Sequence, residues 1–119
     1  VGYKIIGKSK KILFIPDIDK WDEWKKSIIE EVKLVDYAFI DGTFYNGTEI
    51  NRDMREIPHP SIEETLQLFS NQPVAERNKI YFIHINHTNP ILTNKNGIRN
   101  LVEGLGFNIA QKGLKFKLD

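Results

Sequence analysis

The sequence predicts an α/β protein with apolar strands buried between helices or against another sheet. Two observations predict this class: short runs of β-branched and aromatic residues alternate with segments of helical periodicity, and 119 residues with 40% hydrophobic content suit one core. We therefore expect a single domain over residues 1–119. The sequence has no apolar run of membrane-spanning length and no signal-peptide pattern, so we expect a soluble, cytoplasmic protein.

The first part of the chain predicts a hairpin followed by a helix. Residues 3–6 and 11–15 have strand composition, and the Gly and Ser between them favour a tight connection. Pro16 ends the second strand. From Asp19, a candidate helix cap, apolar residues recur at helical spacing. These are Trp21, Trp24, Ile28 and Val32.

The middle of the chain predicts a strand, a long loop and a second helix. Residues 37–40 (YAFI) form the strand, and the polar segment 46–58 forms the loop. Ser61 and Glu64 have capping-box spacing, which predicts where the helix begins. Its apolar face comprises Ile62, Thr65, Leu66 and Phe69.

The last third predicts a strand, a helix and a hairpin. Residues 79–85 read as a fourth strand, with His84 inside it between Ile83 and Ile85. Residues 95–105 have a weak helical pattern. FNIA and LKFKL, on either side of Gly113, predict a closing hairpin.

Charge and cysteine content exclude several classes of function. The 17 basic residues balance 16 acidic ones without long blocks, which argues against a general nucleic-acid binder. The chain has no cysteine, so a metal would be bound by imidazole, carboxylate or water.

Acids and imidazoles follow three predicted strands. Asp17 and Asp19 follow the second, Asp41 follows the third, and the fourth ends in His84 and His87. The carboxyl ends of strands in α/β sheets line the ligand crevice, so we expect a ligand site there. Neutral imidazole and carboxylate together suit zinc, iron or manganese.

Each of these residues also has a structural interpretation. Asp17 could cap the following helix, and His84 could be a hydrogen-bonded core residue. His59 lies between two prolines at the positive end of a predicted helix, near a favourable place for an anion, but could be an ordinary loop histidine. Asn86 and Asn89 are interpreted as turn formers, and His87 is left open.

Four motifs carry a family resemblance over about residues 2–118. FIPD, DYAFIDGTFY, HPSIEETLQLF and IYFIHINHTNP together resemble the C-terminal half of the metallo-β-lactamase-fold hydrolases. Among these, the sequence looks most like the branch that contains coenzyme PQQ synthesis protein B. The resemblance implies half of an αββα sandwich, a mixed sheet with helices on one face, and a fragment of a longer chain.

The resemblance also implies roles for four residues. Asp17 matches the aspartate that bridges two metal ions, and His84 matches the late histidine ligand. His59 matches a non-ligand histidine that contacts substrate phosphate and protonates the leaving group, and Asp41 matches the acid that orients that histidine. The implied reaction is hydrolysis of a phosphodiester or another ester by metal-activated water, with two ions of zinc, manganese or iron.

Two departures from the family pattern shape the expectation. The primary metal motif H-x-H-x-D-H is absent from this sequence, so the chain alone should be inactive and should need the N-terminal half of the fold. Relatives of the PQQ protein B type typically lack the bridging aspartate, to which Asp17 corresponds here.

The alternatives are a non-catalytic α/β binding module with structural histidines and a protein of coenzyme PQQ biosynthesis. An exposed apolar sheet face would favour self-association of the isolated piece.

Overall fold

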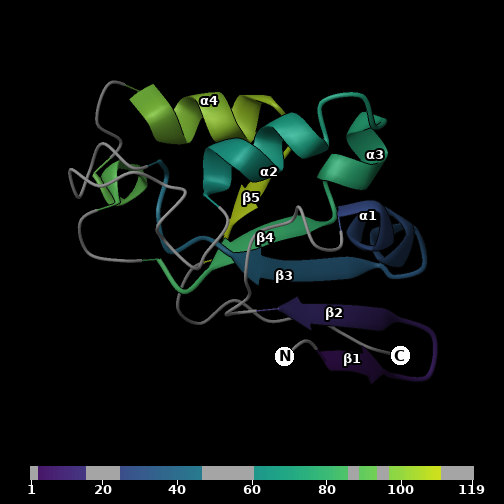
Figure 1. Ribbon diagram of the computed structural model, residues 1–119. Coiled ribbons are helices and arrows are strands. Elements are labelled where there is room, and N and C mark those ends of the chain that lie inside the picture. Colours follow the sequence, from purple (N-terminus) through teal and green to yellow (C-terminus); the bar gives the residue numbers. More distant parts are fainter. Residues whose placement is uncertain (1–2, 16–24, 47–60, 86–88, 94–96, 111–119) are drawn as a thin grey trace.

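The computed structural model describes residues 3–15, 25–46, 61–85, 89–93 and 97–110. A five-stranded sheet has the order β1-β2-β3-β4-β5 (Figure 1). β1 is antiparallel to β2, and each remaining neighbouring pair is parallel, so the predicted mixed sheet is confirmed. The strands are β1 (Tyr3–Ile6), β2 (Lys11–Ile15), β3 (Tyr37–Asp41), β4 (Ile80–Ile83) and β5 (Asn108–Ile109).

The β1–β2 hairpin has the bounds that the sequence predicts. Its turn is closed by the Gly7 amide, which donates to the Lys10 carbonyl at 2.8 Å. The predicted FNIA strand is also present: its two central residues form β5, which pairs in parallel with β4. LKFKL, its expected hairpin partner, lies outside the described residues.

The described helices are α1 (Lys25–Lys33), α2 (Ile62–Leu68), α3 (Val74–Arg77), the 3-10 helix η4 (Pro90–Leu92) and α4 (Ile98–Gly104). α2 begins as its capping box predicts, since the Ser61 hydroxyl accepts a hydrogen bond from the Glu64 amide at 3.0 Å. α1 buries Ile28 and Val32 of the predicted apolar stripe, while Asp19, Trp21 and Trp24 lie outside the described residues. α3 and η4 are additions that the sequence pattern did not predict.

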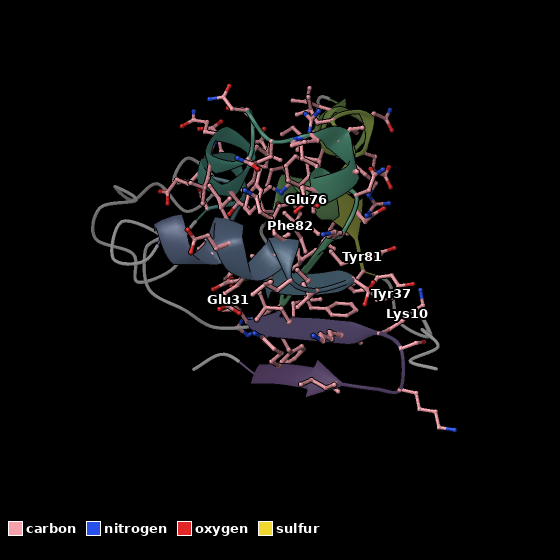
Figure 2. All side chains as sticks on the ribbon, turned by 90° about the vertical axis from the view of Figure 1, so that its right-hand side faces the viewer. Lys10, Glu31, Tyr37, Glu76, Tyr81 and Phe82 are labelled. Atoms are coloured by element: carbon pink, nitrogen blue, oxygen red, sulfur yellow. The ribbon has the colours of Figure 1, made fainter. Side chains whose placement is uncertain are left out.

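The helices pack on one face of the sheet. In β3, Ala38 and Ile40 face the helices and are fully buried, and the alternate positions Tyr37 and Phe39 face the other way. Figure 2 shows Tyr37 and Tyr81 on the side of the sheet away from α1, whose Glu31 is labelled. The helix-covered core includes Leu13, Ile15, Ile28, Val32, Ile62, Phe69, Ile80, Phe82 and Val102.

The opposite face carries a row of aromatic side chains across three strands. The ring centroids of Phe14 and Phe39 are 6.4 Å apart, and those of Phe39 and Tyr81 are 5.6 Å apart. Tyr37 meets Tyr81 edge to face at 6.3 Å. These residues, here called the aromatic face, remain partly exposed, because the described helices lie on the other side. None of the described helices could span a membrane.

The fourth strand is shorter than predicted. The sequence places residues 79–85 in a strand with His84 inside it, but β4 ends at Ile83. His84 has a φ of 59°, in the left-handed region, which interrupts extended pairing at that residue. The prediction of an interior strand position for His84 was wrong: the residue lies just beyond the strand, with an exposed side chain.

Candidate active site

The carboxyl edge of the parallel strands places Asp41 and His84 close together. Asp41 is the last residue of β3 and pairs in register with Ile83, the last residue of β4. His84 follows directly. The expectation that the third and fourth strands bring their polar ends to one edge is therefore confirmed for this pair.

Asp41 is fully buried, with 0% exposure, and contacts both the backbone and the side chain of Thr43. Its Oδ1 accepts hydrogen bonds from the Thr43 amide at 2.9 Å and from the Thr43 hydroxyl at 2.6 Å. The second distance falls in the range of hydroxyl bonds to an ionised carboxylate. Hydrogen bonds of this kind offset part of the cost of burying the acid.

Thr43 links the acid to the imidazole. Its Oγ1 lies 3.2 Å from Nδ1 of His84, so the hydroxyl is in contact with both the carboxylate and the ring. The left-handed backbone of His84 turns the chain at the strand end, and histidine is among the residues that tolerate this conformation better than most. Non-glycine residues with a left-handed backbone cluster at functional sites, so the conformation of His84 supports a functional role for this edge.

Gly42 allows the loop after β3 to pass close to β4. A Cβ atom at this position would lie 2.9 Å from the Phe82 Cβ and 3.1 Å from the Ile83 carbonyl oxygen. The Gly42 amide instead donates to that carbonyl at 2.7 Å. The absence of a side chain therefore brings Thr43 to the end of β4.

Asn89 ties this loop to the segment after β4. Its side chain is buried; Nδ2 donates to the Gly42 carbonyl at 3.0 Å, and Oδ1 accepts from the Ile91 amide at 3.0 Å. The second bond caps η4, which confirms the interpretation of Asn89 as a turn former. The first bond adds a long-range role that the sequence did not predict.

The start of α2 does not offer free amides to an anion. The Phe44 carbonyl accepts from the Ile62 amide at 2.9 Å, and the Tyr45 carbonyl accepts from the Glu63 amide at 3.1 Å. With Glu64 capped by Ser61, the first amides are satisfied by the chain itself, so the expected anion-favouring site at this helix start is not supported. Burial raises the pKa of the nearby Tyr45 phenol above its ordinary value, and the Glu63 carboxylate adds to the rise.

An open hollow of about 570 Å³ adjoins His84. His84 and Arg99 are its polar lining, and apolar side chains from the ends of β4 and β5 and from η4 complete it. Arg99 also stabilises η4, because its Nε donates to the Ile91 carbonyl at 3.0 Å and its Nη2 donates to the Leu92 carbonyl at 3.3 Å. The hollow has the size of a small-molecule site, with few polar groups among apolar ones.

Comparison with known proteins places this geometry in a family. The family described as "Beta-lactamase superfamily domain" matches residues 1–85, a range that includes Asp17, Asp41, His59 and His84. The chain belongs to this superfamily. The resemblance that the sequence motifs carry is thereby confirmed.

Relatives within the superfamily share a name. Coenzyme PQQ synthesis protein B of Gluconobacter oxydans (strain 621H) is 30% identical over 125 residues, which cover 100% of this chain and 40% of that protein. The protein of the same name from Methylobacterium sp. (strain 4-46) is 26% identical over 127 residues, covering 99% and 40%. This chain therefore spans less than half the length of these relatives.

A solved structure supports the fold assignment. The crystal structure described as Zn(2+)-bound PqqB from Methylobacterium extorquens matches with a TM-score of 0.74 at 22% sequence identity. The match covers 98% of this chain and 40% of that one. The predicted class, part of a metallo-β-lactamase sandwich with a mixed sheet and helices, is confirmed.

The superfamily assignment raises the question of whether these residues suit a metal. Within the described ranges, no group of three or more histidines and acids could hold an ion. His84 nevertheless fits one ligand position, because its ring is exposed beside the hollow and its Nδ1 side is supported by Thr43 and Asp41. Asp17, the predicted bridging ligand, and His59, the predicted acid, lie outside the described residues, so their approach to His84 and Asp41 stays a prediction.

Sequence reasoning missed two residues of this site. Thr43 lies within the motif DYAFIDGTFY, where a hydroxyl two residues after a buried acid is a signal for a local hydrogen bond. Arg99 lies on a helix whose pattern was weak, and nothing in its neighbours indicates that it lines the hollow.

Proposed function

We propose that the full-length protein is a metal-dependent hydrolase that cleaves a phosphodiester or a similar ester. The observation that carries this proposal is the group of Asp41, Thr43 and His84 beside the hollow that Arg99 lines. An imidazole supported on its far nitrogen suits metal binding. A guanidinium in the same hollow suits an anionic substrate such as a phosphodiester.

The proposed ligands are Asp17 and His84, which would hold two divalent ions, zinc with manganese or iron as the other options. When bound, these ions supply the positive charge that activates a water molecule for attack on the ester. His84 offers one ring nitrogen at the carboxyl edge. Asp17 comes two residues after the end of β2, whose last residue pairs with Ile40 of the neighbouring strand.

The proposed proton donor to the leaving group is His59, oriented by Asp41. A carboxylate can accept about four hydrogen bonds, so the two from Thr43 are compatible with a further one from an imidazole. In this proposal His59 donates a proton and does not bind metal. Its role is therefore testable by itself.

The remaining ligands are proposed to come from an N-terminal half that packs on the aromatic face. The chain spans 40% of its relatives, and Phe14, Phe39 and Tyr81 form a partly exposed apolar row on a sheet whose other face is already covered. A second sheet is the partner that such a face fits. Residues 1–119 alone are accordingly expected to be inactive and to self-associate.

A second candidate is a role in the biosynthesis of coenzyme PQQ. The relatives named coenzyme PQQ synthesis protein B favour it. The two candidates share the fold and the edge of the sheet, and they differ in whether a simple ester is hydrolysed.

The metal assignment is tested by metal analysis of the purified full-length protein and its Asp17→Ala and His84→Ala variants. Each variant is expected to lose at least one ion per chain, because each removes a ligand. Glu103→Ala, a change at an exposed position of α4, is the matched control and should keep the full metal content. Unchanged metal in both site variants would reject the ligand assignment.

The role of His59 is tested by turnover of bis(p-nitrophenyl) phosphate. His59→Ala is expected to keep its metal and to lose about 10²- to 10⁴-fold in kcat, the usual contribution of a positioned acid. An undiminished rate would remove the proposed role. If the metal-loaded wild type hydrolyses no ester at all, the biosynthetic candidate is favoured instead.

A further inference from the structure

We propose that Thr43 is a positioning residue that selects the tautomer of His84, with the proton on Nδ1 and the lone pair on Nε2. The inference rests on two contacts that share one atom: Thr43 Oγ1 contacts both Asp41 Oδ1 and His84 Nδ1. The distance is 2.6 Å to the carboxylate oxygen and 3.2 Å to the ring nitrogen. This inference deepens the proposed function. It rests on that function only in assuming that a metal ion binds Nε2.

The protons available to these three groups fix the direction of both hydrogen bonds. A threonine hydroxyl has one proton to donate, and an ionised carboxylate can only accept. At 2.6 Å, with the Thr43 amide donating to the same oxygen at 2.9 Å, Asp41 Oδ1 is the acceptor of that proton. The Thr43 hydroxyl therefore has no proton left for the ring.

The proton in the hydrogen bond between Thr43 Oγ1 and His84 Nδ1 must then come from the imidazole. Nδ1 carries the hydrogen and donates it to Oγ1. In a neutral imidazole this leaves Nε2 without a proton, as an acceptor or a ligand. The buried acid thus acts on the ring through the hydroxyl of Thr43.

The backbone keeps the two partners in place. Gly42 holds the loop against the end of β4 through its 2.7 Å bond to the Ile83 carbonyl, one residue before His84. The left-handed conformation of His84 turns the chain at that point. Because both residues are fixed at the strand ends, the hydroxyl needs little ordering to meet the ring.

The tautomer is measured directly in the full-length protein with ¹⁵N in its histidine rings. The protein is freed of metal by chelation and kept at about pH 8.5, and the ¹⁵N shifts of the ring report whether it is neutral. Long-range ¹H–¹⁵N spectra distinguish a protonated Nδ1 from a protonated Nε2, and His84→Gln identifies the His84 signals by their loss. The wild type is expected to have the proton on Nδ1. A proton on Nε2 would overturn the proposal without any Thr43 variant.

Two substitutions then test the hydroxyl itself. Thr43→Val keeps the shape and the backbone amide but removes the hydroxyl, and should shift the proton of His84 toward Nε2. Thr43→Ser keeps the hydroxyl and should retain the wild-type signals. If Thr43→Val leaves the tautomer unchanged while the protein stays folded, Thr43 does not select it.

Zinc titration of the same proteins separates this proposal from the proposed function. Thr43→Val is expected to weaken zinc binding about 10- to 100-fold, as the loss of a residue that supports a ligand usually does, and Thr43→Ser should stay within about threefold of the wild type. A changed tautomer in a protein that binds no zinc would uphold the positioning role and reject the metal site. Weakened zinc binding with an unchanged tautomer would reject the positioning role alone.

Discussion

Single residues at the strand ends decide the geometry of the candidate site. Gly42 is needed because two neighbouring backbones approach closely, and His84 is turned by its left-handed conformation. Thr43 is a small polar residue whose hydroxyl donates to the buried Asp41 carboxylate and contacts the His84 ring. Each role depends on atoms within about 3.2 Å, so small changes should have measurable effects.

Gly42→Ala is predicted to destabilise the full-length protein by about 1–3 kcal/mol, the usual cost of an added methyl group in a packed region. The new Cβ would lie 2.9 Å from the Phe82 Cβ, which neither strand can relieve without moving. The matched control is Gly104→Ala, at the end of α4, where nothing lies within 4 Å. It should be neutral or stabilise by up to about 1 kcal/mol. Urea unfolding measures both, and equal effects would contradict the prediction.

At the scale of elements, short connections position the site as much as the strands do. η4 is held on one side by Arg99, which donates to two of its carbonyls, and on the other by Asn89. Asn89 also reaches the Gly42 carbonyl, so the segments after β3 and β4 are joined by one buried side chain. The wall of the hollow and the loop that carries Thr43 are thereby coupled.

Asn89→Ala is predicted to cost about 2–3 kcal/mol of unfolding free energy, because it leaves the Gly42 carbonyl and the Ile91 amide without this partner. Asn89→Asp keeps an acceptor for the Ile91 amide but loses the donor to Gly42. Hydrogen exchange of the Ile91 amide should therefore be fast in the Ala variant and slow in the Asp variant. Asn71→Ala, at an exposed position, should change stability by no more than about 0.5 kcal/mol. Similar losses for positions 71 and 89 would reject this account of Asn89.

At the scale of the whole molecule, the two faces of the sheet are unequal. One face is buried by helices, and the aromatic face is partly exposed although it carries Phe14, Phe39 and Tyr81. Large apolar patches on a protein commonly mark an interface. The proposed partner is the second sheet of a sandwich in the full-length chain.

Phe39→Lys is predicted to destabilise the full-length protein by about 3 kcal/mol or more, because a covered position would receive an unpaired charge. The control is Leu101→Lys on α4, where the native side chain is 53% exposed and the effect should be within about 0.5 kcal/mol. Urea unfolding of the two variants gives the comparison. A Phe39→Lys protein as stable as Leu101→Lys would mean that nothing covers the aromatic face.

The local elements, and the edge of the sheet at which the site lies, could be read from the order of residues alone. Alternation and β-branched runs predicted β1, β2 and β3, and the capping box predicted the start of α2. Polar residues after the strands predicted that Asp41 and His84 would lie at the same edge of the sheet. These features depend on neighbours in the chain or on the common direction of parallel strands, and a sequence displays both.

The pairing of distant polar side chains becomes visible only in the folded chain. Thr43 and His84 are 41 residues apart, and Asn89 and Gly42 are 47 apart. Apolar periodicity reports which face of an element is buried, but it contains no information on which polar atom a distant loop will meet. The left-handed turn at His84 is likewise not visible in the sequence. It ends a segment whose residue types favour a strand, because the contacts of the assembled edge outweigh local preference.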